Sequence, residues 1–67
     1  MTVAKVIEIS AQSNTSFDDT VREGVERASR TVDNIQSAWV KEFNAEVKDG
    51  KVSSFRVNLK ITFLITD

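Results

Sequence analysis

The chain contains 67 residues, 40% of them hydrophobic, and it has no Cys, no His and no Pro. A chain of this length buries only about 60% of the surface that it exposes when unfolded, so we expect a small core that association with other chains supports. Without Cys and His, the chain cannot form disulfides, thiolate or imidazole zinc sites, or the Ser-His-Asp and Cys-His nucleophilic systems. We therefore predict a single domain over residues 1–67 that is not an enzyme.

Charge and hydropathy limit the classes of partner. Nine Lys and Arg residues face ten Asp and Glu residues, which gives a net charge of −1 and leaves no basic excess to neutralise the phosphates of a nucleic acid. No apolar run reaches the roughly 18 to 20 residues that span a bilayer, and residues 1–10 lack the charged start and long apolar stretch of a signal peptide. We therefore expect a cytoplasmic protein with no nucleic-acid or membrane partner.

The first half of the chain predicts a strand followed by a helix. Residues 2–10 are rich in β-branched side chains with a period of two, which is typical of a strand. Thr15 or Ser16 is suited to the N-cap of a helix, and Asp33 and Asn34 are suited to its end. Between and just beyond them, apolar or small residues recur every three or four positions, as in an amphipathic helix: Phe17, Val21, Gly24, Val25, Ala28, Val32 and Ile35.

The second half predicts a hairpin. From Ser37 the pattern changes to that of a strand, and the pair Asp49-Gly50 favours the positive φ angles of a two-residue turn. Beyond the turn, apolar and polar side chains alternate over residues 54–65, so one face of this strand is core. The element order is therefore β-α-β-β. We expect an α+β fold in which the last strand lies between the other two and antiparallel to both, with the helix on the apolar face of the sheet.

The turn also sets the pairing of the second and third strands. It places Trp39 opposite Lys60 and Lys41 opposite Asn58, with Trp39 pointing away from the helix. A bulge near Lys41 and Glu42 would return the following apolar side chains to a single core. Without a bulge, an apolar stripe lies on the open sheet face, and we favour its burial in a homo-oligomer over burial by a different partner. The stripe consists of Trp39, Phe43, Ala45 and Val47.

The order of elements and several short segments resemble the dodecin family. The segments are KVIEI at the start, SF at the helix entrance, RASRTVDNI at its exit and FRVNLKITFLI at the end, in the family's order across nearly the whole chain. The resemblance implies a three-stranded antiparallel sheet wrapped around one helix. It also implies a non-enzymatic protein that assembles as a hollow homododecamer, with the open sheet face turned inward. Flavin-binding members store riboflavin or FMN, whose rings stack on a Trp and bond to a Gln.

Two positions of this implied flavin site differ in the present sequence. Along TVDNIQSAWV, Ser37 takes the place of the family's stacking Trp, and along FRVNLKITF, Arg56 takes the place of the Gln. Trp39 shares a sheet face with Ser37 and lies about 6.6 Å along the strand, so it is the alternative stacking residue. The competing interpretation is that Trp39 fills the pocket or packs against Lys60 in a cation-π contact.

An anionic ligand would use the cations of the same face. Lys41, Arg56 and Lys60 lie beside Trp39 and suit the phosphate of a cofactor such as coenzyme A, which the resemblance also implies. These cations have a competing role, namely neutralisation of glutamates across subunit interfaces. The glutamates concerned are Glu8, Glu42 and Glu46.

Calcium is a further ligand that the resemblance implies, and a purely structural shell is the remaining alternative. Calcium takes six to eight oxygen ligands, which subunit contacts would have to bring together. The candidate ligands have no EF-hand spacing, so we predict no metal site within one chain. They are Asp18, Asp19, Asp33, Asn34, Glu42, Glu46, Asp49 and Asp67.

Overall fold

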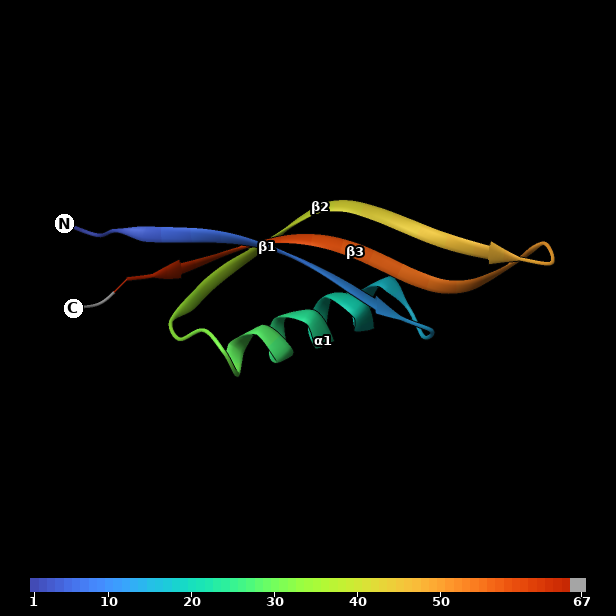
Figure 1. The fold of residues 1–67 in the computed structure, drawn as a ribbon, viewed down its shortest axis with the longest axis horizontal. Helices are drawn as coiled ribbons and strands as arrows, with labels where there is room; N and C mark the ends of the chain where they lie inside the picture. Colours follow the sequence, from blue (N-terminus) through green and yellow to red (C-terminus); the bar gives the residue numbers. More distant parts are fainter. Residues whose placement is uncertain (66–67) are drawn as a thin grey trace.

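A computed structural model of the chain shows one sheet and one helix (Figure 1) and describes residues 1–65. The elements are β1 (Ala4–Ser13), α1 (Phe17–Ser29), β2 (Ile35–Lys48) and β3 (Lys51–Leu64). The predicted order β-α-β-β and the α+β class are confirmed.

β3 is the central strand of the sheet. The strand order is β1-β3-β2, and both outer strands run antiparallel to β3, as predicted. The pairing of β1 with β3 is continuous from Ala4 opposite Leu64 to Ser13 opposite Phe55. A central strand makes ladder hydrogen bonds on both edges, so the most apolar strand of the chain occupies the most protected position.

The core lies between β3 and α1. Val57, Leu59 and Ile61 alternate along β3 and are at most 1% exposed. Because alternate strand residues point to opposite faces, α1 covers the side of the sheet to which these three side chains point. Figure 1 shows no element on the other side, which we call the open face. Partly buried side chains surround the core: Ile7, Ile9, Ala11, Phe17, Val21, Val25, Ala28, Ile35, Ala38 and Val40.

The start of α1 agrees with the prediction. The Ser16 hydroxyl accepts a hydrogen bond from the Asp19 backbone N–H at 3.0 Å, which makes Ser16 the N-cap. The buried hydroxyl of Thr20 donates to the Ser16 carbonyl and lies 2.6 Å from the hydroxyl of Ser13. These contacts attach the first turn of the helix to the end of β1, which continues three residues beyond the predicted strand.

The end of α1 comes earlier than predicted. The helix ends at Ser29, and the chain then turns, with the backbone N–H of Val32 donating to the Ala28 carbonyl at 2.9 Å. Asn34 has a positive φ of 63°, a conformation that its short polar side chain tolerates, and this residue directs the chain into β2. Ile35, predicted on the helix, is therefore the first residue of β2. Among residues 1–65, no helix combines the length and the hydropathy that crossing a membrane requires.

The pairing of β2 with β3 contains three register shifts: one lies between Ile35 and Ser37 near the start of β2, and two opposed bulges follow nearer the turn. Asp49 and Gly50 both have positive φ, as predicted for the turn, and Trp39 pairs with Lys60. Asn58, however, pairs with Glu42, so Lys41 is an extra residue in β2 and its predicted pairing is wrong. A register shift between the pairs Glu46–Ser54 and Val47–Val52 leaves one extra residue in β3 and restores the register that the turn dictates.

The bulge at Lys41 changes the side on which the second half of β2 places its apolar residues. Phe43 now pairs with Val57 and points to the helix side, where its ring centroid lies 5.1 Å from that of Phe17 in a T-shaped pair. The expected open-face stripe of Trp39, Phe43, Ala45 and Val47 is therefore wrong, because the alternative with a bulge applies. Trp39 alone of these four stays on the open face.

The hairpin extends beyond the N-terminal end of α1 (Figure 1). Phe43, Val47 and Val52 lie on the helix side of this extension, and they are 61%, 66% and 53% exposed. We call these three side chains the arm patch. Phe17 at the start of α1 contacts Phe43, but the helix leaves most of this apolar patch exposed, as is typical of a protein–protein contact surface.

Gly24 marks a close approach of α1 to the sheet. A Cβ at this position would lie 3.0 Å from the Ala11 Cβ and 3.2 Å from the Leu59 Cδ1. Gly24→Ala gains about 1 kcal/mol of helix propensity but loses about 1 to 3 kcal/mol through overpacking, since the Ala11 methyl moves only with its backbone. We expect a net loss of about 1 kcal/mol in the free energy of unfolding, measured in urea.

The double variant Ala11→Gly/Gly24→Ala is the matched control, because it removes the closest of these contacts. A double-mutant cycle should show a coupling free energy of about 1 kcal/mol in favour of the double variant. Additive effects of the two substitutions would contradict the close approach as the cause.

Candidate ligand-binding face

The open face brings together the residues that the sequence patterns single out. Trp39 on β2, Lys60 on β3 and Glu8 on β1 lie opposite one another and form one row across the sheet. Ser37 lies one row away in one direction, and Arg56 lies two rows away in the other. The structure therefore places Ser37, Trp39, Lys60 and Arg56 on a common surface.

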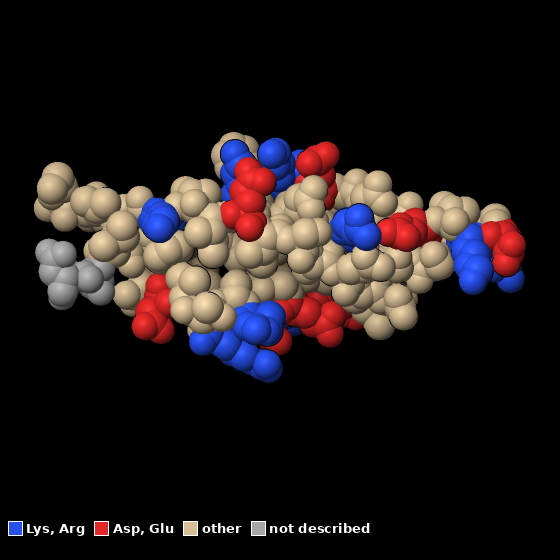
Figure 2. Space-filling view, viewed as in Figure 1, with Lys and Arg blue, Asp and Glu red and all other residues tan. Residues whose placement is uncertain are grey.

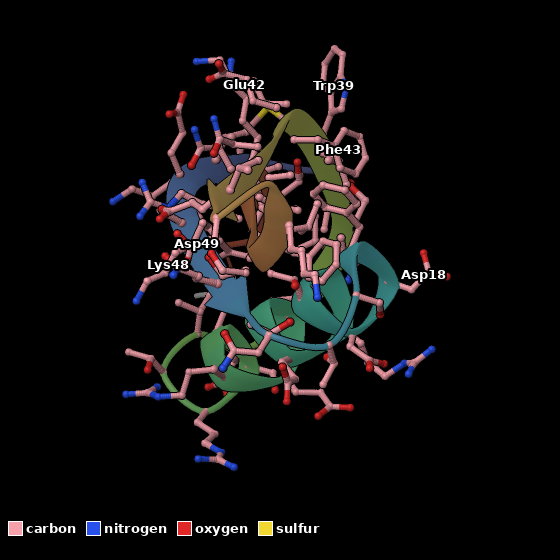
Figure 3. All side chains as sticks on the ribbon, turned by 90° about the vertical axis from the view of Figure 1, so that its right-hand side faces the viewer. Asp18, Trp39, Glu42, Phe43, Lys48 and Asp49 are labelled. Carbon is pink, nitrogen blue, oxygen red and sulfur yellow. The ribbon has the colours of Figure 1, made fainter. Side chains whose placement is uncertain are left out.

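The side chain of Trp39 projects from this surface. Trp39 is 73% exposed, and Figure 3 shows it pointing away from α1, as Glu42 does. The aromatic pairs among the described residues join Phe17 to Phe43 and to Phe55, and they do not include Trp39. Within one chain Trp39 does not fill a pocket, so its indole is accessible to a ligand or to another chain.

Glu8 lies close to two of the predicted cations. Its Oε1 is 3.5 Å from the Nζ of Lys41 and 3.9 Å from the Nζ of Lys60. Lys41 is the bulged residue of β2, and its side chain reaches toward β1 across the open face. All three side chains are about half exposed, so each ion pair contributes little to stability. Glu8 nevertheless offsets one of the two positive charges beside Trp39 within the chain.

Arg56 connects all three strands. Its guanidinium donates from Nε and Nη2 to the Gln12 Oε1 on β1, at 3.2 and 2.9 Å, and from Nη2 to the Glu46 Oε1 on β2 at 2.9 Å. Gln12 Nε2 in turn donates to the Ser54 hydroxyl at 3.2 Å. A planar guanidinium suits such a bridge between two acceptors. Arg56 on β3 therefore links β1 and β2 through its side chain, and we call this arrangement the clamp.

These contacts give the pairing of the three cations within one chain. Lys41 and Lys60 pair with Glu8, and Arg56 pairs with Glu46, so neutralisation takes place inside one chain. Glu42 instead accepts a hydrogen bond from the Asn58 Nδ2 at 3.3 Å. Figure 2 shows the result as basic and acidic side chains side by side along the upper edge, on the side of the sheet opposite α1.

The candidate calcium ligands are spread over the molecule. Asp18 and Asp19 lie at the start of α1, Asp33 and Asn34 precede β2, and Asp49 lies in the hairpin turn. Figure 3 shows Asp18, Asp49 and Glu42 in separate places. Residues 1–65 hold no group of three or more acidic side chains that could bind a metal ion, and Asp67 lies outside the described residues. A calcium site would have to combine ligands from several chains.

Sequence reasoning missed Glu8 and Gln12 as partners of the site cations within one chain. The sequence does contain a signal for the contact between Glu8 and Lys60, since a glutamate opposite a lysine is a favourable cross-strand pair. It can be read only when the register of β1 against β3 is known. No tight turn joins these two strands, so the sequence does not set that register directly.

Because Arg56 links three strands, we predict that its replacement lowers the free energy of unfolding more than replacement of Lys60, a cation on the same face of β3. Arg56→Met keeps the apolar stem but removes every donor to Gln12 and Glu46, and should lower the free energy of unfolding by about 1 kcal/mol. Lys60→Met is the matched control and should cost less than about 0.5 kcal/mol, because the ion pair of Lys60 with Glu8 is long and exposed. Urea unfolding of both variants measures this difference, and equal losses would contradict the clamp.

Comparison with known proteins agrees with the fold. The sequence profile of the Dodecin family matches residues 3–66. The calcium dodecin of Mycobacterium tuberculosis is 36% identical over 63 residues, which are 94% of this chain and 89% of that protein.

Solved structures give the same result. The dodecin from Streptomyces davaonensis superposes with a TM-score of 0.93 at 27% identity, over 98% of this chain and 97% of that chain. The calcium dodecin from Mycobacterium tuberculosis, a calcium-chelating antigen with a calcium-binding site, superposes with a TM-score of 0.82 at 34% identity. The match covers 96% of this chain and 91% of that chain. The match of the family profile to nearly the whole chain, together with these likenesses, shows that the chain belongs to the dodecin family.

Proposed function

We propose that this chain is a non-enzymatic ligand-binding and storage protein of the cytoplasm that assembles into a hollow homododecamer. Membership in the dodecin family, whose members are homo-oligomeric and bind small ligands, supports this function. The exposed indole of Trp39 on a polar sheet face is the observation that carries the choice of ligand.

The distribution of apolar side chains supports assembly. The fully buried hydrophobic residues among residues 1–65 are Val57, Leu59 and Ile61, a small core even for a chain of this size. The arm patch of Phe43, Val47 and Val52 remains exposed. Covering this patch with further copies of the same chain adds buried apolar area, and homo-oligomers of this kind are mostly closed, symmetric particles. Twelve chains of 7.5 kDa amount to a particle of about 90 kDa.

A flavin such as riboflavin or FMN is the ligand that best fits Trp39. Ser37 occupies the family position of the stacking Trp, and Trp39 offers an indole on the same face, about 6.6 Å along β2. Stacking of a flat heteroaromatic ring on an indole is favourable in an offset arrangement. If the open face is turned inward, the shell shields the stacked ring from bulk solvent.

Replacement of Trp39 tests this site. Trp39→Ala should weaken riboflavin binding by about five- to 150-fold, because ring stacking contributes about 1 to 3 kcal/mol. Light scattering should still give a mass near 90 kDa for the variant, since Trp39 is not part of the arm patch. Quenching of flavin fluorescence gives the affinity, for riboflavin and for FMN.

Two further variants act as controls for this experiment. Trp39→Phe keeps an aromatic plane and should retain most of the affinity. Ser37→Trp/Arg56→Gln introduces the family's flavin-binding residues and should bind riboflavin. Equal affinities of wild type and Trp39→Ala would rule out stacking on Trp39. A particle of about 90 kDa that leaves flavin fluorescence unchanged would rule out flavin storage.

Calcium is the second candidate, and the likeness to the calcium dodecin of Mycobacterium tuberculosis favours it. Glu42 is the best placed carboxylate, because it points away from α1 and forms no ion pair among the described residues (Figure 3). Symmetry-related copies would each supply the same carboxylate to a shared site. Such an arrangement provides the several oxygen ligands that calcium needs.

Isothermal titration of the assembled protein with calcium tests this second candidate. Glu42→Gln should lower the calcium affinity at least about tenfold, because a charged ligand becomes a neutral amide. Glu26→Gln on the exposed surface of α1 is the control with the same change in net charge and should bind as wild type does. Equal affinities of wild type and Glu42→Gln, or no binding by either, would exclude Glu42 as a calcium ligand.

A further inference from the structure

Glu8 lies where an anionic ligand would bind. Its Oε1 is 3.5 Å from the Nζ of Lys41 and 3.9 Å from the Nζ of Lys60. The two lysines come from β2 and β3, whereas Glu8 comes from β1. Two ammonium groups around one oxygen form a suitable arrangement for a phosphate. The open face therefore contains a two-lysine anion site that is filled by a carboxylate of the same chain.

This filled site adjoins Trp39. Lys60 lies directly opposite Trp39 on the neighbouring strand, about 4.8 Å away in the hydrogen-bonding direction, and Lys41 is two residues further along β2. A phosphate attached to a ring on Trp39 would have these lysines as its nearest cations. Arg56 is not a substitute, because its guanidinium is bonded to Gln12 and Glu46.

We infer that Glu8 is a specificity-determining residue, because it occupies the anion position of Lys41 and Lys60 and so makes the site at Trp39 select uncharged aromatic ligands over phosphate-bearing ones. The inference rests on the proposed ligand site and narrows its ligand class from flavins in general to riboflavin rather than FMN. A phosphate has to displace a carboxylate whose attachment to the sheet keeps its local concentration high. An uncharged ring leaves Glu8 in place.

We expect the preference for uncharged ligands to be small and to depend on the salt concentration. The side chains of Glu8, Lys41 and Lys60 are 57%, 47% and 40% exposed. Ion pairs with this exposure are weak and are screened by salt. We therefore expect a discrimination of about fivefold at low ionic strength that decreases as salt is added.

Binding of inorganic pyrophosphate to the assembled protein tests the inference without any flavin. Isothermal titration at low ionic strength gives the affinity, and the fluorescence of Trp39, the single Trp of the chain, shows whether the anion binds nearby. Glu8→Gln keeps the size of the side chain and removes its charge, and it should bind pyrophosphate about fivefold more tightly than wild type. The affinity of this variant for FMN relative to riboflavin should rise by the same factor.

Two variants locate the effect. Glu8→Gln/Lys60→Gln should not show the tighter pyrophosphate binding of Glu8→Gln, because one of the two ammonium groups is gone. Glu26→Gln makes the same change in net charge on the exposed surface of α1 and should bind pyrophosphate as wild type does.

The outcomes separate this inference from the proposed function. Equal pyrophosphate affinities of wild type and Glu8→Gln would overturn the inference, as would an equal gain in Glu26→Gln. If neither flavin binds while Glu8→Gln gains affinity for pyrophosphate, flavin storage fails and the filled anion site at Lys41 and Lys60 stands.

Discussion

The difference in length between one helix and two strands determines most of this structure. α1 has 13 residues and is about 20 Å long, whereas the 14-residue strands β2 and β3 each extend over about 46 Å. A single helix cannot cover such a sheet, so it covers the part where Val57, Leu59 and Ile61 are buried. The hairpin beyond it keeps an exposed apolar patch, and the opposite face of the sheet has no cover at all. In the proposed function, further copies of the chain cover this patch, and the open face is the surface for a ligand.

One inserted residue gives β2 two different roles. Trp39, before the bulge at Lys41, points away from α1, whereas Phe43, after it, points to the helix side and pairs with Phe17. Without the bulge, both aromatic side chains would lie on the open face, and the ligand surface would also be the main apolar surface. The bulged residue has a further effect, since its ammonium group lies near Glu8. The bulge thus separates the arm patch, which we propose as the surface for assembly, from the open face, which we propose as the surface for a ligand.

The three cations discussed for the open face each have a carboxylate partner within the chain, which fits the storage function proposed above. Lys41, Lys60 and Arg56 have carboxylate partners at 2.9 to 3.9 Å. Paired charges of this kind offer neither a free nucleophile nor a strong site for phosphate, but they leave the indole of Trp39 accessible. The resulting surface is suited to holding a flat ring by stacking. The same pairing is the basis of our inference that a face with three cations prefers an uncharged ligand.

The sequence by itself determined the element order, an N-cap at Thr15 or Ser16 and the turn at Asp49-Gly50, because each depends on local periodicity or turn chemistry. The general rules of strand connection predicted the central position of β3. It also placed Ser37, Trp39, Arg56 and Lys60 on one face, since strand alternation and the turn relate β2 to β3 over a short distance. The tertiary structure alone decided the bulge at Lys41 and the side on which Phe43 lies. A bulge gives up one ladder position for the packing of Phe43 on Phe17, and that balance depends on where α1 lies. Likewise, only the register of β1 against β3 makes Glu8 a partner of Lys60 and Gln12 a partner of Arg56. The packing of Ile7 and Ile9 against the core sets this register, because α1 and β2 separate β1 from β3 in the chain.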